Sequence, residues 1–185
     1  MAQTPSNMLA LGTAAPLFNL QDTDGKSCKT SDFDGQPLLV MFICNHCPFV
    51  IHVAGELARL GRDYMAKGVG VVAISSNDIV KYPQDRPELM AVEKKKHGYP
   101  FSYLFDETQA VAKAYQAACT PDFYLFDKTH KLVYRGQLDA SRPGNGKPVT
   151  GTDLRLAIDA VLAGKKPDAD QKPSIGCNIK WRPSS

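Results

Sequence analysis

The sequence has no run of about 20 apolar residues, the length that a helix needs to span a bilayer. Its N-terminus, from Met1 to Asn7, lacks a basic segment followed by an apolar one, so no secretory signal is visible. There is no internal repeat, and the net charge is only +3. If the chain is complete, we expect a cytoplasmic protein whose partners include neither a membrane nor a nucleic acid.

Cysteine is sparse, with five in the chain and one closely spaced pair, Cys44 and Cys47. An odd number does not fit a disulfide framework, but it fits one redox or metal-binding pair plus three separate cysteines. A structural zinc site usually needs a second such pair or paired histidines, and the sequence has neither. We therefore expect no metal and no other cofactor. Copper or zinc binding that also uses His46 and His52 is a weaker alternative.

Hydrophobic patterning predicts the fold class. Uniformly apolar runs at 37–43 and 69–74 predict strands buried on both faces, as in a parallel sheet. An apolar stripe from Val50 to Tyr64 predicts a helix directly after the first strand. The turn Asp24-Gly25 predicts an N-terminal hairpin. The remaining predicted strands are 101–104, 122–126 and 131–135, and the remaining predicted helices are 87–97, 108–117 and 152–162. This order indicates an α/β fold with a mainly parallel central sheet, added antiparallel strands and helices on both faces.

The chain is expected to form a single domain over residues 1–185, with its core at about 15–164. The tail 165–185 carries several prolines together with Cys177 and the only tryptophan, Trp181. Because these apolar residues stand out in such a segment, we expect the tail to dock on the domain.

The pair Cys44 and Cys47 lies at the junction of a predicted strand and helix. Free N–H groups and the helix dipole stabilise a thiolate there, and the thiolate is the nucleophile of disulfide exchange. We predict that Cys44, nearer the helix start and more exposed, attacks a substrate disulfide, and that Cys47 resolves the mixed disulfide. Pro48 lacks an N–H and fits the first helical turn, which places both thiols at the helix mouth.

His46 lies between the two cysteines. A protonated or hydrogen-bonding imidazole beside Cys44 favours the thiolate and destabilises the disulfide. We therefore predict a pair that is more oxidising than one with Gly-Pro between the cysteines. The alternative is an exposed His46 with no electrostatic role.

Three stretches resemble one known family: 42–50, with Cys44-Asn45-His46-Cys47-Pro48-Phe49, then 119–123, and then 176–181. They are similar to the thioredoxin-like redoxins of the alkyl hydroperoxide reductase/thiol-specific antioxidant type. This resemblance implies a thioredoxin-like fold with an N-terminal extension, and a supporting role for Asn45, His46 and Pro48. It also implies a cis peptide bond at Thr120-Pro121 that faces the cysteines, which makes Thr120 and Pro121 candidate substrate-binding residues.

Two positions depart from the wider superfamily. Leu38 stands where thioredoxins have a buried acid, so the handling of protons must differ. Met41 stands where peroxiredoxins have the threonine of Pro-x-x-x-Thr-x-x-Cys, although Pro37 fits the proline. We predict a thiol–disulfide oxidoreductase in a redox or antioxidant role, with protein or small-molecule disulfide substrates and a thiol electron donor. A peroxidase that uses Cys44 is the alternative, and a copper or zinc metallochaperone is less favoured.

The other cysteines have separate predictions. Cys119 immediately precedes the Thr120-Pro121 turn and is either a third redox thiol or an inert core residue. Cys28 is expected to be structural. Whether Cys177 reaches the site does not follow from the sequence.

Overall fold

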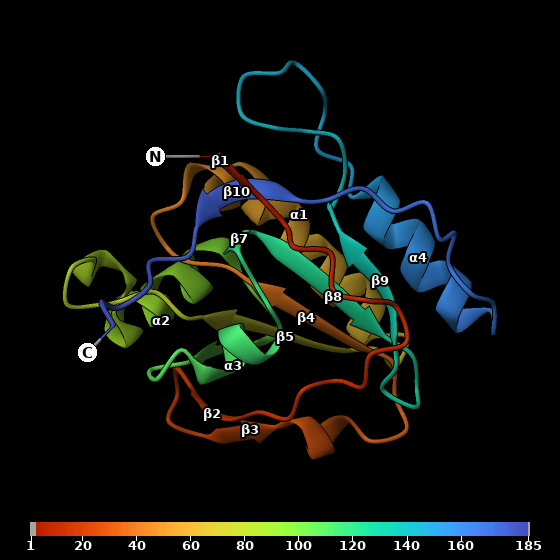
Figure 1. Ribbon diagram of the computed structural model, residues 1–185, viewed down its shortest axis with the longest axis horizontal. Helices are drawn as coiled ribbons and strands as arrows, with labels where there is room; N and C mark the ends of the chain where they lie inside the picture. Colours follow the sequence, from red (N-terminus) through yellow and green to blue (C-terminus); the bar gives the residue numbers. More distant parts are fainter. Residues whose placement is uncertain (1–2, 185) are drawn as a thin grey trace.

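The computed structural model describes residues 3–184 (Figure 1). Its central sheet has seven strands. They are β2 (Asn19–Asp22), β3 (Ser27–Lys29), β4 (Leu38–Phe42), β5 (Gly70–Ser75), β6 (Ser102–Phe105), β8 (Asp122–Phe126) and β9 (Leu132–Gly136). Their order across the sheet is β3-β2-β6-β5-β4-β8-β9.

Parallel pairing is confined to the middle of this sheet, between β4 and β5 and between β5 and β6. The pairs β2–β3, β2–β6, β4–β8 and β8–β9 are antiparallel. The α/β fold class is thus confirmed, but the sheet is mixed rather than mainly parallel. Hairpins form both edges, and a hairpin always joins strands of opposite direction.

Helices cover the two faces of the sheet. They are α1 (Pro48–Met65), α2 (Pro87–His97), α3 (Ala110–Ala114) and α4 (Thr152–Leu162), with short 3-10 helices at Thr30–Phe33 and Pro83–Asp85. Side chains alternate along β4: Leu39 and Met41 join the core cluster that contains α1, α2 and α4, whereas Leu38, Val40 and Phe42 join the cluster that contains α3. Both faces are therefore buried, which explains the uniformly apolar sequence of the strand.

The predicted helix at 108–117 is shorter in the structure, where α3 spans only Ala110–Ala114. Gln109 and Gln116 adopt φ angles of +65° and +53°, and this left-handed backbone cannot continue a right-handed helix. Over residues 3–184, no helix combines the length and apolar character needed to cross a membrane.

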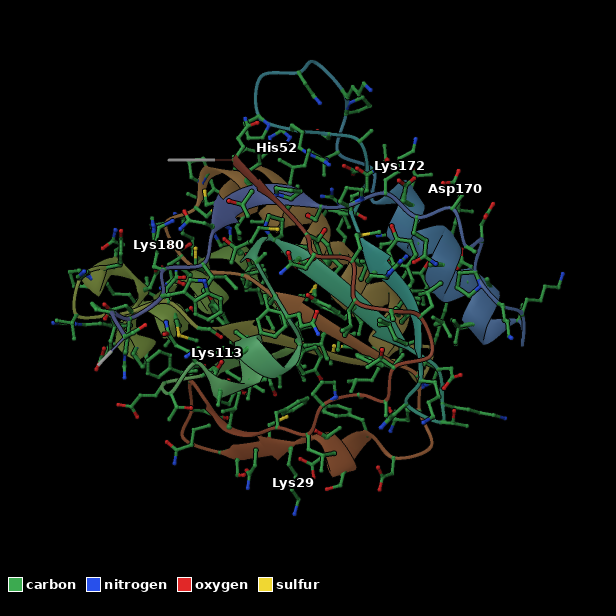
Figure 2. The ribbon with its side chains drawn as sticks, in the orientation of Figure 1. Lys29, His52, Lys113, Asp170, Lys172 and Lys180 are labelled. Atoms are coloured by element: carbon green, nitrogen blue, oxygen red, sulfur yellow. The ribbon has the colours of Figure 1, made fainter. Side chains whose placement is uncertain are left out.

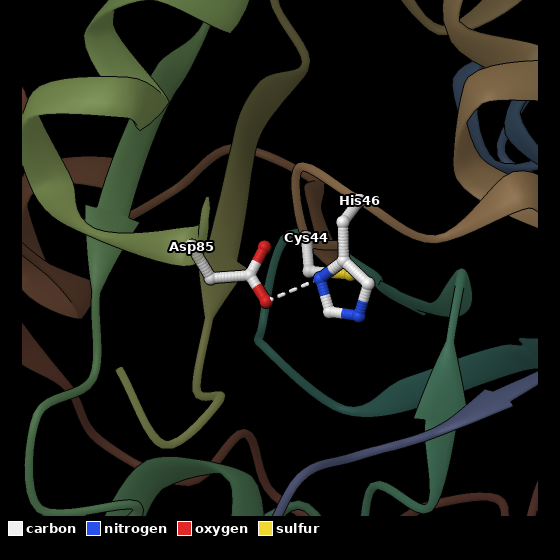
Figure 3. Close-up of side chains that lie close together, drawn as sticks. All are labelled: Cys44, His46 and Asp85. Atoms are coloured by element: carbon white, nitrogen blue, oxygen red, sulfur yellow. Dashed lines mark ion pairs between the residues drawn. The ribbon is translucent and has the colours of Figure 1, made fainter. Parts of the chain in front are cut away.

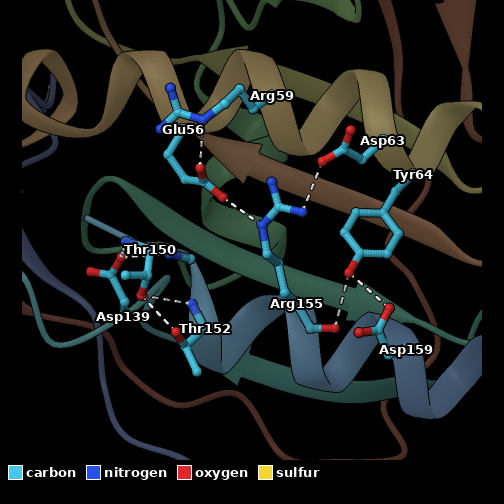
Figure 4. Close-up of polar contacts among 10 residues, drawn as sticks. Glu56, Arg59, Asp63, Tyr64, Asp139, Thr150, Thr152, Arg155 and Asp159 are labelled. Atoms are coloured by element: carbon cyan, nitrogen blue, oxygen red, sulfur yellow. Dashed lines mark hydrogen bonds and ion pairs between the residues drawn. The ribbon is translucent and has the colours of Figure 1, made fainter. Parts of the chain in front are cut away.

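Polar contacts fasten α4 to α1 (Figure 4). Arg155 Nε donates to Glu56 at 2.6 Å, and Arg155 Nη1 donates to Asp63 at 2.9 Å. The Tyr64 hydroxyl donates to Asp159 at 2.8 Å. Glu56 is only 4% exposed, and its carboxyl group pairs with both Arg155 and Arg59. These contacts brace the helix whose N-terminal end carries the cysteine pair.

A second, three-stranded sheet was not predicted. It consists of β1 (Gln3–Pro5), β10 (Ile175–Asn178) and β7 (Cys119–Thr120), in the antiparallel order β1-β10-β7. In Figure 1 the blue β10 lies beside the red β1, although the two come from opposite ends of the chain. The tail therefore packs on the domain. Its strand β10 pairs Cys177 with Thr120, which is the first residue of the Thr120-Pro121 turn.

Candidate active site

The cysteine pair occupies the connection between β4 and α1. Helix α1 begins at Pro48, and Cys47 is its N-cap residue. The prediction that Cys44 lies nearer the helix start is therefore wrong, because a bend at residues 45–46 separates Cys44 from the helix, whereas Cys47 adjoins it. Cys44 is 3% exposed and Cys47 is 0% exposed, so both thiols are buried in the reduced protein.

Polar groups surround the Cys44 side of the site. The Cys44 sulfur lies 3.6 Å from the Thr120 hydroxyl. His46 Nδ1 lies 2.6 Å from the Asp85 carboxylate, close beside Cys44 (Figure 3). The backbone N–H of Asn45 donates to the other Asp85 oxygen at 2.8 Å. The bend that follows Cys44 is thus tied to one acidic side chain.

Asp85 is held firmly in place. It is 0% exposed and accepts a hydrogen bond from Asn77 Nδ2 at 2.9 Å. Burial by itself opposes ionisation of the carboxyl group, but the close contact with the His46 ring and the hydrogen bond from Asn77 outweigh it, so the pKa of Asp85 is lowered. The His46 ring also stacks on Tyr82, with ring centroids 5.7 Å apart. A charged carboxylate and an oriented imidazole therefore flank Cys44.

The Cys47 side is built from sulfur and backbone. The Cys47 sulfur lies 3.3 Å from the Thr120 carbonyl oxygen and 2.6 Å from the sulfur of Cys177. The Thr120-Pro121 peptide bond is cis, and Thr120 belongs to β7, which pairs with the strand that carries Cys177. Thr120 thus contacts both cysteines, through its hydroxyl on one side and its carbonyl on the other.

The two thiols ionise differently. The hydrogen bond with Cys44 and the one with Cys177 lower the pKa of Cys47 to about 5. The same bond to Cys47, together with burial and the Asp85 charge, raises the pKa of Cys44 well above its ordinary value. The N-cap position also favours a negative charge on Cys47. The resting dithiol therefore carries its thiolate on Cys47, whereas the helix argument from sequence favoured Cys44.

The third sulfur at the site is Cys177 and not Cys119. Cys119 is 0% exposed, and its thiol is directed to the Pro121 carbonyl at 3.7 Å. Burial, followed by the charge of Asp122, raises the pKa of Cys119 far above its ordinary value. This environment fits the inert core residue that was one of the two predictions for Cys119.

Sequence reasoning missed Asp85, Asn77 and Tyr82. All three lie in the polar segment after β5, and loops at the carboxyl edge of a sheet commonly carry functional side chains. That position was the available signal, but it did not single out a residue. Cys177 was noticed but not placed, because only the β10–β7 pairing brings it to Cys47.

Three potential metal ligands lie close together at the site. The Cys44 sulfur, His46 Nδ1 and an Asp85 oxygen lie within 4.8 Å of one another. A soft thiolate, an imidazole and a carboxylate together are a set that zinc accepts. However, Nδ1 and the carboxylate already bond to each other, so an ion would have to break that contact.

Comparison with known proteins places this site in a family. The family model described as AhpC/TSA matches residues 11–135. Peroxiredoxin Bcp of Escherichia coli is 32% identical over 131 residues, which cover 69% of this chain and 79% of that protein. The thioredoxin-like fold and the paired thiols define a redoxin. The chain belongs to the AhpC/TSA family, as its motifs suggested.

Two other relatives match this chain over different shares of their own length. Thiol-disulfide oxidoreductase ResA of Geobacillus thermodenitrificans is 26% identical over 89% of this chain and 83% of that protein. Peroxiredoxin Q of Oryza sativa subsp. japonica is 31% identical over 55% of this chain, but the match spans only 44% of that relative. The relatives of this chain are thus named for two related thiol chemistries.

Solved structures agree with the fold. An uncharacterized conserved protein from Geobacillus kaustophilus is 57% identical, with a TM-score of 0.98 over 100% of this chain and 99% of that one. The thioredoxin domain of a thiol-disulfide oxidoreductase from Bacteroides vulgatus is 22% identical, with a TM-score of 0.60 over 70% of this chain and 89% of that one. The second match concerns the fold alone and confirms the thioredoxin-like class.

Proposed function

We propose that the protein is a thiol–disulfide oxidoreductase that exchanges disulfides through Cys44 and Cys47. The observation that carries the proposal is the contact of both sulfurs with Thr120. The cysteines directly precede α1, and Thr120 belongs to the cis-proline loop that lies against them. Two neighbouring thiols of unlike pKa suit an attacking and a resolving role. The substrates would be protein or small-molecule disulfides, and a thiol donor would return the electrons.

The first step needs a base, because Cys44 is protonated at rest. Its partner Cys47 carries the thiolate and is hydrogen-bonded to it. Cys47 therefore takes the Cys44 proton while the Cys44 sulfur attacks the substrate disulfide. A Cys44–substrate disulfide forms and the first substrate thiolate leaves. Cys47 thus serves as the base of this step, and the step requires no acid at the position of Leu38.

The second step releases the product. Cys47 gives its proton to the departed thiolate and attacks the Cys44 sulfur of the mixed disulfide. The Cys44–Cys47 bond forms, and the second substrate sulfur leaves as a thiolate. One substrate disulfide is reduced and one protein dithiol is oxidised, so the electrons balance. His46, fixed by Asp85, orients the bend that follows Cys44 throughout.

Insulin-disulfide reduction with a thiol donor tests this proposal. Turnover should vanish in Cys44→Ser, whereas Cys28→Ser, a buried cysteine outside the site, should retain it. Mass spectrometry of a Cys47→Ser variant should show substrate trapped on Cys44, because the resolving thiol is missing. Failure of the wild-type protein to turn over with any thiol donor would rule out the proposed role.

A thiol peroxidase is the second candidate, and one contact favours it. Met41 leaves no hydroxyl at the position where peroxiredoxins have threonine, but the Thr120 hydroxyl lies 3.6 Å from the Cys44 sulfur. A peroxide bound at Cys44 would therefore have the Thr120 hydroxyl nearby as a hydrogen-bond donor. Rapid thiol-dependent loss of hydrogen peroxide that depends on both Cys44 and the Thr120 hydroxyl would support this candidate over disulfide exchange.

A further inference from the structure

Cys47 has two sulfur neighbours, and the mechanism above uses only one of them. Its sulfur lies 2.6 Å from that of Cys177, and a disulfide bond is about 2.05 Å long. Cys177 comes from the far end of the chain, but it belongs to the same core cluster as Cys44 and Cys47. A small movement of either side chain would therefore bring the two sulfurs to bonding distance.

Gly176 makes this approach feasible. A Cβ atom at position 176 would collide with the Thr120 carbonyl, so only glycine lets β10 lie this close to β7. The register pairs Cys177 with Thr120, the residue that touches both active-site cysteines. The glycine thus sets the spacing, and the next residue supplies the sulfur.

Cys177 is buried to the same degree as the other two thiols: it is 2% exposed, against 3% for Cys44 and 0% for Cys47. The sulfur that it contacts is that of Cys47, at 2.6 Å. Burial first, and then the bond to Cys47, raise the pKa of Cys177 to about 12, so it rests as a thiol. Its available reaction partner is therefore the neighbouring Cys47.

We propose that Cys177 is a third redox thiol, which exchanges with the Cys44–Cys47 disulfide to form a buried Cys47–Cys177 disulfide. This inference rests on the proposed disulfide exchange, which supplies the starting bond. The Cys177 sulfur attacks the Cys47 sulfur, the Cys44–Cys47 bond breaks, and the Cys177 proton passes to the leaving Cys44 thiolate. One disulfide replaces another, so no external oxidant or reductant is consumed.

The exchange changes what the oxidised protein can do. Cys44 becomes a free thiol again, while the disulfide now joins Cys47 to Cys177. The new bond also ties β10 covalently to the N-cap residue of α1, beside the cis-proline loop. The protein thus has two oxidised forms, one with the disulfide at Cys44 and one with Cys44 available for reaction.

Peptide mapping of oxidised protein distinguishes these forms. Cys44 and Cys47 share the tryptic peptide 30–59, whereas Cys177 lies on a separate peptide that ends at Lys180. The full-length Cys44→Ser variant, treated with oxidised glutathione, should yield these two peptides cross-linked. The cross-link should be lost in Cys44→Ser/Cys177→Ala and retained in the matched variant Cys44→Ser/Cys119→Ala, which removes a different buried cysteine.

Wild-type protein gives a second readout that needs no variant. After one equivalent of oxidised glutathione, the internal Cys44–Cys47 bond should appear first. The cross-linked peptide should follow, with Cys44 open to alkylation. Absence of the cross-link from both wild type and Cys44→Ser would overturn the inference, even if insulin reduction is normal. A protein that forms the cross-link but reduces no disulfide would instead overturn the proposed function.

Discussion

The two sides of the site differ in the pKa of the buried acid that each one contains. Beside Cys44, Asp85 is fully buried but accepts hydrogen bonds from Asn77 and the Asn45 N–H and lies 2.6 Å from His46 Nδ1, and its pKa is lowered. Beyond Cys47, behind the cis-proline loop, Asp122 is equally buried and is bonded by the Tyr124 hydroxyl and the Phe123 N–H. Burial there raises the pKa of Asp122 to about 7.

This contrast shows that burial alone does not set the charge of an acid, because the groups that the fold places against the carboxyl also decide whether it ionises. The Cys44 side keeps a carboxylate beside an imidazole. The Cys47 side keeps protons on Asp122 and Cys177, which suits a closed core. The resting thiolate lies between these regions, on Cys47.

The largest expected effect concerns Asp122. Its folded pKa of about 7 exceeds the ordinary aspartate value of 3.8, so the folded state binds the extra proton between these values. The stabilisation from this proton is complete below about pH 4 and is lost as the pH rises through 7, by up to a few kcal/mol. Urea unfolding from pH 4 to 8 should show this loss in wild type and a flatter profile in Asp122→Asn. Parallel profiles would show that Asp122 does not titrate in this range.

The next effect concerns Gly176. Gly176→Ala places a methyl group against the Thr120 carbonyl and should lower the free energy of unfolding by about 1–3 kcal/mol. The matched Gly55→Ala change lies within α1, where the new methyl meets only the Arg59 guanidinium at 3.6 Å, so it should not destabilise. Equal stability of both variants would mean that β10 tolerates a wider spacing from β7.

A smaller effect tests the Cys44 side. Asp85→Asn removes a negative charge that raises the pKa of Cys44, so the pH midpoint of Cys44 alkylation should fall by about one unit, or about tenfold in rate at fixed pH. The measurement belongs in a Cys47→Ser background, where Cys44 alone reports. Asp78→Asn, in the same polar segment, is the matched control. An upward shift would show that the charge of His46 dominates at Cys44.

The smallest effect concerns the Thr120 hydroxyl. Its contact with Cys44 favours the thiolate, so Thr120→Val should raise the alkylation midpoint of Cys44 by less than about one unit. The same Cys47→Ser background applies. Valine preserves the shape of the side chain and leaves the carbonyl near Cys47 unchanged. An unaltered midpoint would mean that the hydroxyl does not influence Cys44.

Much of the fold follows from local patterns. The runs that became β4 and β5 are apolar at every position because both faces of the sheet are covered, and the stripe from Val50 to Tyr64 became α1. The two-residue β7 and the three-residue β1 have no such pattern. They exist only because β10 lies between them, and pairing of distant segments leaves no local signal.

By itself, the sequence determined the strand–CxxC–helix unit, the family and the position of the two thiols. Hydrophobic period and motif spacing are local properties, so one stretch of chain suffices to recognise them. Only the tertiary structure decided which cysteine is the N-cap, which acid faces His46 and which third sulfur reaches Cys47. Asp85 and Cys177 come from distant segments, and the pKa of a thiol depends on whatever charges and donors the fold brings to it.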